Sequence, residues 1–387
     1  NLSLVIDRSS SMSVKGRLEY AKAAARHVVQ QLEEGDRLSI VTFDRHVQVP
    51  VTSQVLGDRA AMIQAIQTIA LGKWTNLHSG WEEGGHQVRQ YQGGDTVNRI
   101  MLLSDGWPSV GITKSAIIAA NVKKLSAAGV STTAIGVGDD YNEDLLGAIA
   151  TSGDGNYHYI SLPEHLPEAF EQEMQSLSKM VGQQVMLDIR PKGDITIDTV
   201  LNKLPVSPSG QFKLPNLVEG YAFSVVVRLA IPALNEASKM EREMWATDEL
   251  LNLCSFRLAW QSPSGVAQPV QKAMLQLPVV AATDYARYPI NSEVQQQVAL
   301  LLSARLKQEA MYAADRQDYS TAHNFLYEAK SVVRDAPTSP ALELDLVALE
   351  SLEADLGARQ IKQFRKRSHK SAYQTQIGYD QTIVPLD

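Results

Sequence analysis

Cysteine is almost absent from this sequence of 387 residues, which has only Cys254. A lone cysteine excludes a disulfide within the chain and a zinc site built from a cysteine cluster. Cys254 lies in the apolar, strand-like run Leu253–Trp260. We therefore expect a protein that folds without disulfides, in a reducing compartment.

Long hydrophobic runs are also absent. No run of about 18 apolar residues is present, so the sequence predicts no transmembrane segment. The first residues lack the basic and then apolar layout of a secretory signal, and we expect a cytoplasmic location. Because Asn1 leads directly into the apolar run Leu2–Ile6, we also expect the natural protein to begin earlier, with room there for a targeting signal or further strands.

The chain has no excess of positive charge. It has 36 lysines and arginines against 43 acidic residues, a net charge of −7. Nothing in this balance attracts nucleic acid or an anionic membrane, and we expect no nucleic-acid partner. Hydrophobic residues at 44% and charged residues at 20% are normal for a globular protein, and this length predicts two or three domains.

Motifs of common enzymes are missing as well. The sequence has no phosphate-binding Gly-x-x-x-x-Gly-Lys-Ser/Thr loop, no Gly-x-Ser-x-Gly elbow and no His-Glu-x-x-His helix. Asp7 could act as the nucleophile of a phosphatase, but Ser9 stands where that chemistry needs a second acid. The histidines show no spacing typical of zinc ligands. We therefore expect no enzymatic activity.

The first 180 residues alternate between β-branched apolar runs and helical patterns, which predicts a doubly wound α/β domain over residues 1–181 with a mostly parallel sheet. Gly153–Asn156 is expected to form a turn. The expected strands are Leu2–Ile6, Leu38–Phe43, Ile100–Leu103 and Thr132–Val137, with His46–Thr52 as an antiparallel edge strand. The expected helices are Arg17–Glu33, Arg59–Ile69, Ser79–Tyr91, Thr113–Ala128, Asn142–Ala150 and Pro163–Met180.

Three oxygen-rich loops stand out in this domain: Asp7–Met12, Gly72–Asn76 and Ser104–Gly106. In an open sheet of this type, ligands bind beyond the carboxyl ends of the strands, where such loops converge. Their hydroxyl and carboxylate oxygens suit Mg²⁺, and Mn²⁺ or Ca²⁺ share the preference for oxygen. A spacing of two along an extended loop lets the side chains of the first loop face inward together.

The pattern Asp-x-Ser-x-Ser at 7–11, with Thr75 and then Asp105-Gly106 after an apolar strand, resembles the metal-ion-dependent adhesion site of von Willebrand factor A domains. Thr-Asn-Leu-His-Ser-Gly-Trp at 75–81, Leu-Leu-Ser-Asp-Gly at 102–106 and Val-Gly-Ile-Thr at 110–113 are similar to the bacterial branch of that family. The resemblance implies a Rossmann-like fold and a Mg²⁺ whose sixth ligand is a carboxylate of a partner protein. The implied ligands are the hydroxyls of Ser9, Ser11 and Thr75, with Asp7 and Asp105 acting directly or through water.

Some residues around this motif leave alternatives open. Ser10 stands where the family often has glycine, and its Cβ restricts the loop backbone. Arg8 either strengthens binding of an acidic ligand or points into solvent. Trp74 and Trp107 are anchors of a partner interface if they are exposed and loop packing if they are buried.

A purely structural reading of the first loop also exists. In it, Ser9 and Ser11 are turn or capping residues ahead of a helix, and Asp7 accepts hydrogen bonds at a strand end. Capping does not require three loops that match in order and spacing. We therefore favour the metal site.

From residue 182 the pattern changes to short alternating runs separated by Pro, Gly and Ser, which predicts an all-β sandwich over residues 182–289. In the bacterial relatives that the chain resembles, a sandwich follows the A domain. The expected strands are Val185–Ile189, Ile195–Val200, Phe223–Ile231, Phe256–Trp260 and Met274–Leu277.

Residues 290–373 are expected to form a C-terminal α-helical region of antiparallel hairpins, with residues 374–387 as a loosely ordered tail. The alanine spacing around Asp318 resembles one tetratricopeptide-like hairpin, although close packing of small residues explains it equally. The last expected helix is acidic at its start and basic between Arg359 and Lys370, which indicates either a solvated surface or a docking site for an acidic protein. The expected helices are Glu293–Arg316, Tyr319–Val333 and Ala341–Leu356.

These observations favour a Mg²⁺-dependent protein-binding or scaffold protein that recognises an acidic group on its partner. An alternative from the resemblance is an adaptor of a separate ATPase of the AAA type, since this chain has no nucleotide site of its own. A third hypothesis, a hydrolase whose metal activates water, lacks a general base near the site.

Overall fold

The computed structural model describes residues 1–93, 96–232, 246–247, 250–278 and 286–376. Two compact units divide the chain, the first made of residues 1–183, 216–219 and 262–266 and the second of the remaining segments. The limits of the three domains expected from the sequence stay a prediction.

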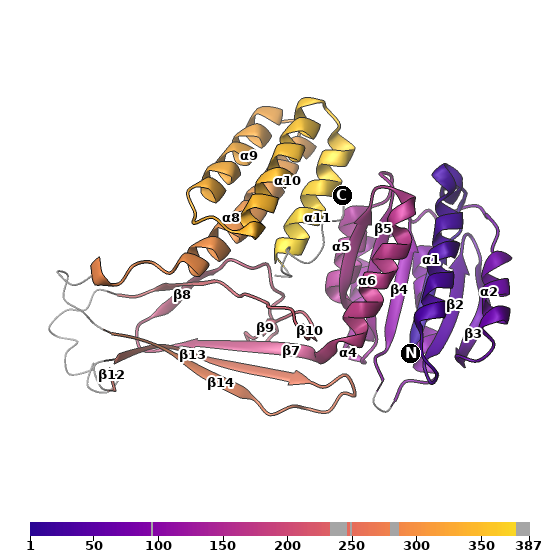
Figure 1. Ribbon diagram of the computed structural model, residues 1–387, viewed down its shortest axis with the longest axis horizontal. Coiled ribbons are helices and arrows are strands. Elements are labelled where there is room, and N and C mark those ends of the chain that lie inside the picture. The colour runs from indigo at the N-terminus through magenta and orange to yellow at the C-terminus, as the bar shows by residue number, and fades with distance from the viewer. Residues whose placement is uncertain (94–95, 233–245, 248–249, 279–285, 377–387) are drawn as a thin grey trace. The chain divides into compact units, whose positions relative to one another are not determined.

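The first unit contains a six-stranded sheet with the order β3-β2-β1-β4-β5-β6 (Figure 1). All neighbours in it are parallel except β3, which is antiparallel to β2 at the edge. This order confirms the doubly wound α/β fold and the antiparallel edge strand expected from the sequence. The strands are β1 (Leu2–Asp7), β2 (Arg37–Phe43), β3 (Val47–Val55), β4 (Arg99–Ser104), β5 (Ser131–Val137) and β6 (Asp154–Ile160).

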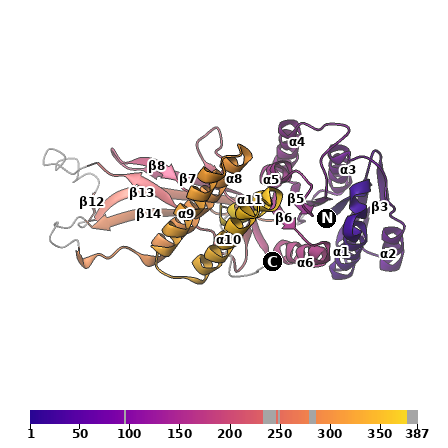
Figure 2. The same ribbon diagram turned by 90° about the horizontal axis from the view of Figure 1, so that it is seen from above.

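Helices cover both faces of this sheet, as Figure 2 shows. One face carries α1 (Arg17–Gln31), α2 (Arg59–Gln67) and α6 (Leu166–Ser178), and the other α3 (Leu77–Arg89), α4 (Ser115–Ala127) and α5 (Glu143–Ser152). Two 3-10 helices, η1 (Ser10–Gly16) and η2 (Pro163–His165), precede α1 and α6. The sheet therefore forms the middle of three layers.

The central strands are buried on both sides, which explains their unbroken apolar character. Leu4 and Ile6 of β1 face the core shared with α1, while Val5 faces α3. Helix α3 approaches the sheet closely because it carries glycines: a Cβ on Gly84 would lie 2.4 Å from Val5 Cγ2, and one on Gly80 would lie 2.5 Å from the Phe43 ring. These contacts hold β1 and the loop before α3 in fixed positions.

Strand β6 is missing from the sequence prediction. The turn expected at Gly153–Asn156 is shorter than predicted, because β6 begins at Asp154, directly after α5. Asp154 has a φ of 52°, so the change of direction takes place at that one residue. The strand has no β-branched residue before Ile160, and its polar side chains pair with other polar groups inside the domain, so it lacked the usual apolar signal.

The region after residue 180 contains antiparallel sheets, as expected. Strand β8 (Thr196–Val200) pairs with β11 (Val227–Ala230), so the predicted strand Phe223–Ile231 is only partly formed. Face-to-face packing as a sandwich stays a prediction. The larger sheet has the order β10-β7-β13-β12, with β14 beside β13 and β9 beside β7. Its strands are β7 (Met180–Pro191), β9 (Phe212–Lys213), β10 (Leu217–Val218), β12 (Ala246–Thr247), β13 (Leu250–Gln261) and β14 (Gln271–Pro278).

The helical region begins at Ser292 and confirms the expected helical end of the chain. Its helices are α8 (Ser292–Asp315), α9 (Tyr319–Arg334), α10 (Pro340–Gly357) and α11 (Ile361–Gln376). Helix α11 packs against both α10 and α8, so the four helices close into a bundle (Figure 1). A buried ion pair between Lys307 and Asp345 lies inside it.

The expected helix Ala341–Leu356 agrees with α10 to within one residue at each end, but the basic residues that we expected to continue it lie in a further helix. The acidic and basic halves of the expected last helix belong to two helices, α10 and α11, which are separated by a turn in which Arg359 has a φ of 55°. The chain turns there because α11 returns to pack on α8, a tertiary contact that local sequence does not encode. Residues 374–376 of the expected tail belong to α11, and residues 377–387 lie outside the described part. Among the described helices, none is both long and apolar enough to cross a membrane.

Candidate metal centre

The three oxygen-rich loops lie at the carboxyl ends of the central strands. Asp7 is the last residue of β1, and Asp105 directly follows β4. The two strands are parallel neighbours, with Ile6 beside Leu103, so the loops that follow them start side by side. Thr75 lies two residues before α3, the helix that packs on both strands.

The five side chains implied as metal ligands come together. Ser9 Oγ lies 3.0 Å from Ser11 Oγ, and Ser11 Oγ donates a hydrogen bond of 2.6 Å to Asp105 Oδ1. The Ser9 amide donates to Asp7 Oδ1 at 2.8 Å. A Cβ added at Gly106 would lie 3.5 Å from Ser11 Oγ and 3.7 Å from Thr75 Oγ1, so the two hydroxyls border the same small space. All five groups present oxygen, which suits a hard cation.

The serine side chains do not cap a helix. Ser9 precedes η1 but makes no capping hydrogen bond through its side chain, and α1 begins after Gly16, again without a side-chain cap. The capping part of the structural reading is therefore wrong, whereas Asp7 does accept hydrogen bonds at the end of β1, as that reading expected. Ser10 is not among the residues with positive φ, so a Cβ at this position adds no backbone strain.

Both carboxyl groups are fully buried, and this has an electrostatic cost. Burial, together with the nearby charge of Asp105, raises the pKa of Asp7 to about 7 against the lowering effect of hydrogen bonds from Ser104 and Ser9. Burial also raises the pKa of Asp105, although Ser11 and Arg17 oppose it. A divalent cation between the two groups would remove this repulsion, so the arrangement fits a metal.

Two residues that were not among the predicted ligands fix these carboxylates. Ser104 Oγ donates to Asp7 Oδ2 at 2.7 Å, and the Arg17 guanidinium donates to Asp105 Oδ2 at 2.7 Å from a buried position. Each carboxylate therefore accepts a hydrogen bond at both of its oxygens. The adjacency of Ser104 to Asp105 was a signal in the sequence, whereas nothing marked Arg17.

The loop that carries Thr75 is held by Asp44, another residue without a sequence signal. Asp44 forms a largely buried ion pair with Arg8 at 2.9 Å, and its other oxygen accepts from the Lys73 amide at 3.2 Å. Arg8 therefore does not point freely into solvent. On the far side, Ser109 Oγ accepts a hydrogen bond of 2.9 Å from the Thr75 amide.

The two tryptophans beside the candidate ligands are exposed. Trp74 has 55% of its surface accessible, and Trp107 has 60%. The interpretation of these residues as loop packing is therefore wrong. Their role as interface anchors stays a prediction.

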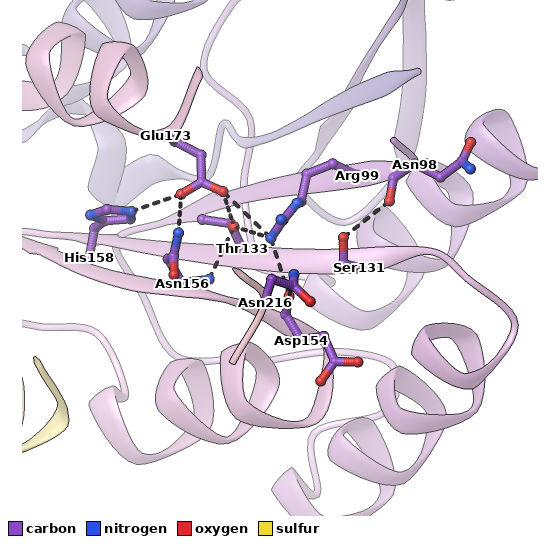
Figure 3. A network of polar contacts seen from close by, with 9 residues as sticks. All are labelled: Asn98, Arg99, Ser131, Thr133, Asp154, Asn156, His158, Glu173 and Asn216. Atoms are coloured by element: carbon purple, nitrogen blue, oxygen red, sulfur yellow. Dashed lines mark hydrogen bonds and ion pairs between the residues drawn. The ribbon is translucent and has the colours of Figure 1, made fainter. Parts of the chain in front are cut away.

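A second cluster of polar side chains joins α6 to strands β4, β5 and β6 (Figure 3). Buried Glu173 of α6 accepts hydrogen bonds from Thr133 and Asn156, lies 3.2 Å from His158 Nε2 and pairs with Arg99 at 3.5 Å. Burial alone would raise the pKa of Glu173, but the His158 hydrogen bond and the Arg99 charge lower it to about 2. Because both carboxylate oxygens are engaged, this cluster holds α6 to the sheet.

Other metal sites are not evident in the described part of the chain. No group of three or more His, Cys, Asp or Glu side chains there is placed to hold a metal ion. The candidate centre has only two carboxylates, and hydroxyl groups supply the rest of its ligands.

Comparison with known families supports the fold of this part of the chain. Residues 1–172 match the family described as von Willebrand factor type A domain. These residues form a von Willebrand factor type A domain. The match ends within α6 and includes all three loops of the candidate centre.

Relatives of the A domain occur in bacteria. The chain is 30% identical over 203 residues to the uncharacterized protein sll0103 of Synechocystis, a match that covers 51% of this chain and 46% of that protein. It is 32% identical over 192 residues to the uncharacterized protein YfbK of Escherichia coli, covering 49% of this chain and 33% of that protein. The chain thus matches less than half the length of these relatives.

Solved structures are similar beyond the A domain. A von Willebrand factor type A protein from Catenulispora acidiphila matches with a TM-score of 0.67 at 17% identity, over 86% of this chain and 79% of that one. The ArnB paralog VWA2 from Sulfolobus acidocaldarius matches with a TM-score of 0.58 at 17% identity, over 97% and 87%. At these identities the likeness shows the fold alone.

Proposed function

We propose that this chain is a non-enzymatic binding protein whose A domain holds Mg²⁺ and binds a carboxylate of a partner protein through it. The observation that carries the proposal is the meeting of three hydroxyls and two carboxylates from three loops. Domains of this family commonly bind proteins, which supports a binding role. No observation favours an ATPase adaptor, which stays a prediction from the resemblance.

The chain's own residues divide the work at this centre. When bound, Mg²⁺ supplies concentrated positive charge and a position open to an incoming carboxylate. Ser9, Ser11 and Thr75 are the direct ligands in our proposal, and Asp7 and Asp105 balance the charge of the metal. Mn²⁺ or Ca²⁺ could occupy the same oxygen set.

The surrounding contacts keep the ligands in position before the metal arrives. Arg17 and Ser104 hold the two carboxylates, and the ion pair of Arg8 with Asp44 holds the loop of Thr75. A site fixed in this way binds the metal without first ordering its loops. It therefore avoids the loss of conformational entropy that such ordering would cost.

Calorimetric titration of Mg²⁺ and Mn²⁺ into the metal-stripped chain tests the proposal. We expect saturable binding that is weakened at least about tenfold by Ser11→Ala and lost in Asp105→Ala, because each change removes an oxygen of the centre. Ser13→Ala is the matched control, since Ser13 lies in the same loop and bonds only to the Ser10 carbonyl. Equal affinity in the Ser11→Ala and Ser13→Ala variants would show that the serines do not hold a metal.

A further inference from the structure

Large apolar side chains stand exposed in or next to all three loops of the candidate metal centre, within residues 7–16, 70–76 and 105–114. The loop after β1 carries one, the loop before α3 carries two, and the loop after β4 carries two. We call these five residues the apolar collar: Val14, Leu71, Trp74, Trp107 and Ile112. Exposed apolar side chains that gather around one point mark an interaction surface more often than isolated ones.

The three loops are bonded to one another, so the segments that carry the collar meet at the candidate metal centre. The Gly72 amide donates to the Arg8 carbonyl at 2.6 Å, which joins the first and second loops. The Ser109 amide donates to the Thr75 carbonyl at 2.9 Å and joins the second and third. Trp74 directly precedes Thr75 in the chain, and Trp107 lies two residues after Asp105.

Trp74 is presented to solvent by a rigid and unfavourable backbone. Its φ is 70°, a conformation that bulky residues rarely adopt. Hydrogen bonds hold the residues on both sides: the Arg45 amide donates to the Lys73 carbonyl at 2.9 Å, and the Thr75 amide donates to Ser109. A large aromatic side chain that is exposed and already ordered makes an effective contact, since little entropy is lost on binding.

The charges of the same loops complement an acidic partner. In segments 7–16, 70–76 and 105–114, the two acidic residues, Asp7 and Asp105, are fully buried. The exposed charged side chains of these segments are all lysines: Lys15, Lys73 and Lys114. Within these three segments the exposed charge is therefore positive, although the whole chain has a net charge of −7.

We propose that the apolar collar and its lysines select protein segments in which the metal-binding Asp or Glu is flanked by large apolar side chains. This inference rests on the proposed function, and it adds the neighbours of the carboxylate as determinants of specificity. Lysines and tryptophans together also suit a membrane surface. We favour a protein segment because the collar residues stand on three separate loops around one small centre and not along an amphipathic helix.

Three labelled peptides test the inference with the full chain and Mg²⁺. The first has a central Asp between Leu-Phe and Leu-Phe, the second has the same Asp between Ser-Gly pairs, and the third replaces the Asp of the first by Asn. We expect the first peptide to bind at least about tenfold more tightly than the second, and we expect Mg²⁺ removal or the Asn replacement to abolish this binding. Equal affinity for the first two peptides would overturn the inference.

Variants of the apolar collar test whether its side chains cause the preference for apolar flanks. Trp74→Asn combined with Trp107→Ser removes both aromatic anchors, and Asn tolerates the positive φ at position 74. This variant should bind Mg²⁺ and the polar-flanked peptide as before but lose most of its preference for apolar flanks. Ile117→Ala is the matched control, because Ile117 is 45% exposed on α4, outside the three loops. A preference that survives in the double variant would contradict the role of the collar.

Further outcomes separate this inference from the proposed function. Binding of Mg²⁺ and of the polar-flanked peptide without any preference would overturn the collar alone. Failure to bind Mg²⁺ would overturn both proposals. Binding of the wild type, but not of the double variant, to phosphatidylserine vesicles, without any peptide preference, would show that the collar recognises a membrane surface.

Discussion

The A domain contains two buried acidic centres on one sheet, and they behave in opposite ways. Asp7 at the carboxyl end of β1 has a pKa raised to about 7, whereas Glu173, which packs on the sheet from α6, has a pKa lowered to about 2. Both side chains are buried, so burial alone does not explain the difference. The partners decide it: Glu173 has Arg99 and His158, whereas Asp7 has a second carboxylate nearby.

The folded chain itself supplies the partners that stabilise the charge of Glu173. It does not supply enough positive charge for Asp7 and Asp105. Around Glu173, the ionised carboxylate is matched by donors and stabilises the fold. Around Asp7 and Asp105, hydrogen bonds from serines only partly offset the cost of burial and the repulsion between the two carboxylates, and in our proposal a cation removes that repulsion. Changes in the first centre should therefore affect stability, and changes in the second should affect metal binding.

The largest expected effect concerns the pH dependence of the metal-free protein. Because the pKa of Asp7 is raised from 3.8 to about 7, the folded state keeps a proton that the unfolded chain loses between about pH 4 and 7. The free energy of unfolding should fall as pH rises through that window, by about 4 kcal/mol relative to Asp7→Asn, and stay level above it. Urea unfolding of both proteins from pH 4 to 8 would measure this.

The control for this experiment is Glu34→Gln, at an exposed position of the same domain. Saturating Mg²⁺ should abolish the loss in free energy of unfolding that the wild type shows relative to Asp7→Asn at neutral pH, because bound metal favours the ionised form of Asp7. A stability difference between wild type and Asp7→Asn that does not change with pH would contradict the raised pKa.

Glu173→Gln should cost about 3 kcal/mol of stability at neutral pH. The pKa of Glu173 is lowered from 4.5 to about 2, so its ionised form stabilises the fold above about pH 4.5, and this contribution is lost as pH falls toward 2. Urea unfolding at pH 7 would measure the loss, and Mg²⁺ affinity of the folded variant should remain unchanged. Exposed Glu168 on the same helix provides the control Glu168→Gln, and an equally small effect of both changes would refute the structural role of Glu173.

The smallest effect should come from Gly72→Ala. A Cβ there would lie 2.1 Å from Asp44 Oδ2, so Asp44 must move away from Arg8 and the loop of Thr75 must shift. We expect a loss of about 1–2 kcal/mol in stability and a several-fold weaker affinity for Mg²⁺. Gly57→Ala is the control, because its nearest neighbour would be 3.9 Å away. Unchanged metal affinity in Gly72→Ala would mean that this loop does not position a ligand.

Much of the A domain could be predicted from its sequence because its signals are local. Fully buried strands such as β1 and β4 read as unbroken apolar runs, and the oxygen-rich loops follow them directly. Strand β6 escaped prediction because the domain supplies partners for its polar side chains. The separation of α10 from α11 escaped it because the turn around Arg359 serves a contact with α8, far away in the sequence.

The sequence by itself determined the doubly wound fold and the order of Asp7, Ser9, Ser11, Thr75 and Asp105, since periodicity and motif spacing are properties of neighbouring residues. Only the tertiary structure decided how these side chains are held: Arg17 reaches Asp105 across 88 positions, and Arg8 reaches Asp44 across 36. It also decided that Trp74 and Trp107 are exposed and that Glu173 is fully paired. Burial and ion pairing depend on which distant segments of the chain come into contact, and the spacing of residues along the sequence does not show these contacts.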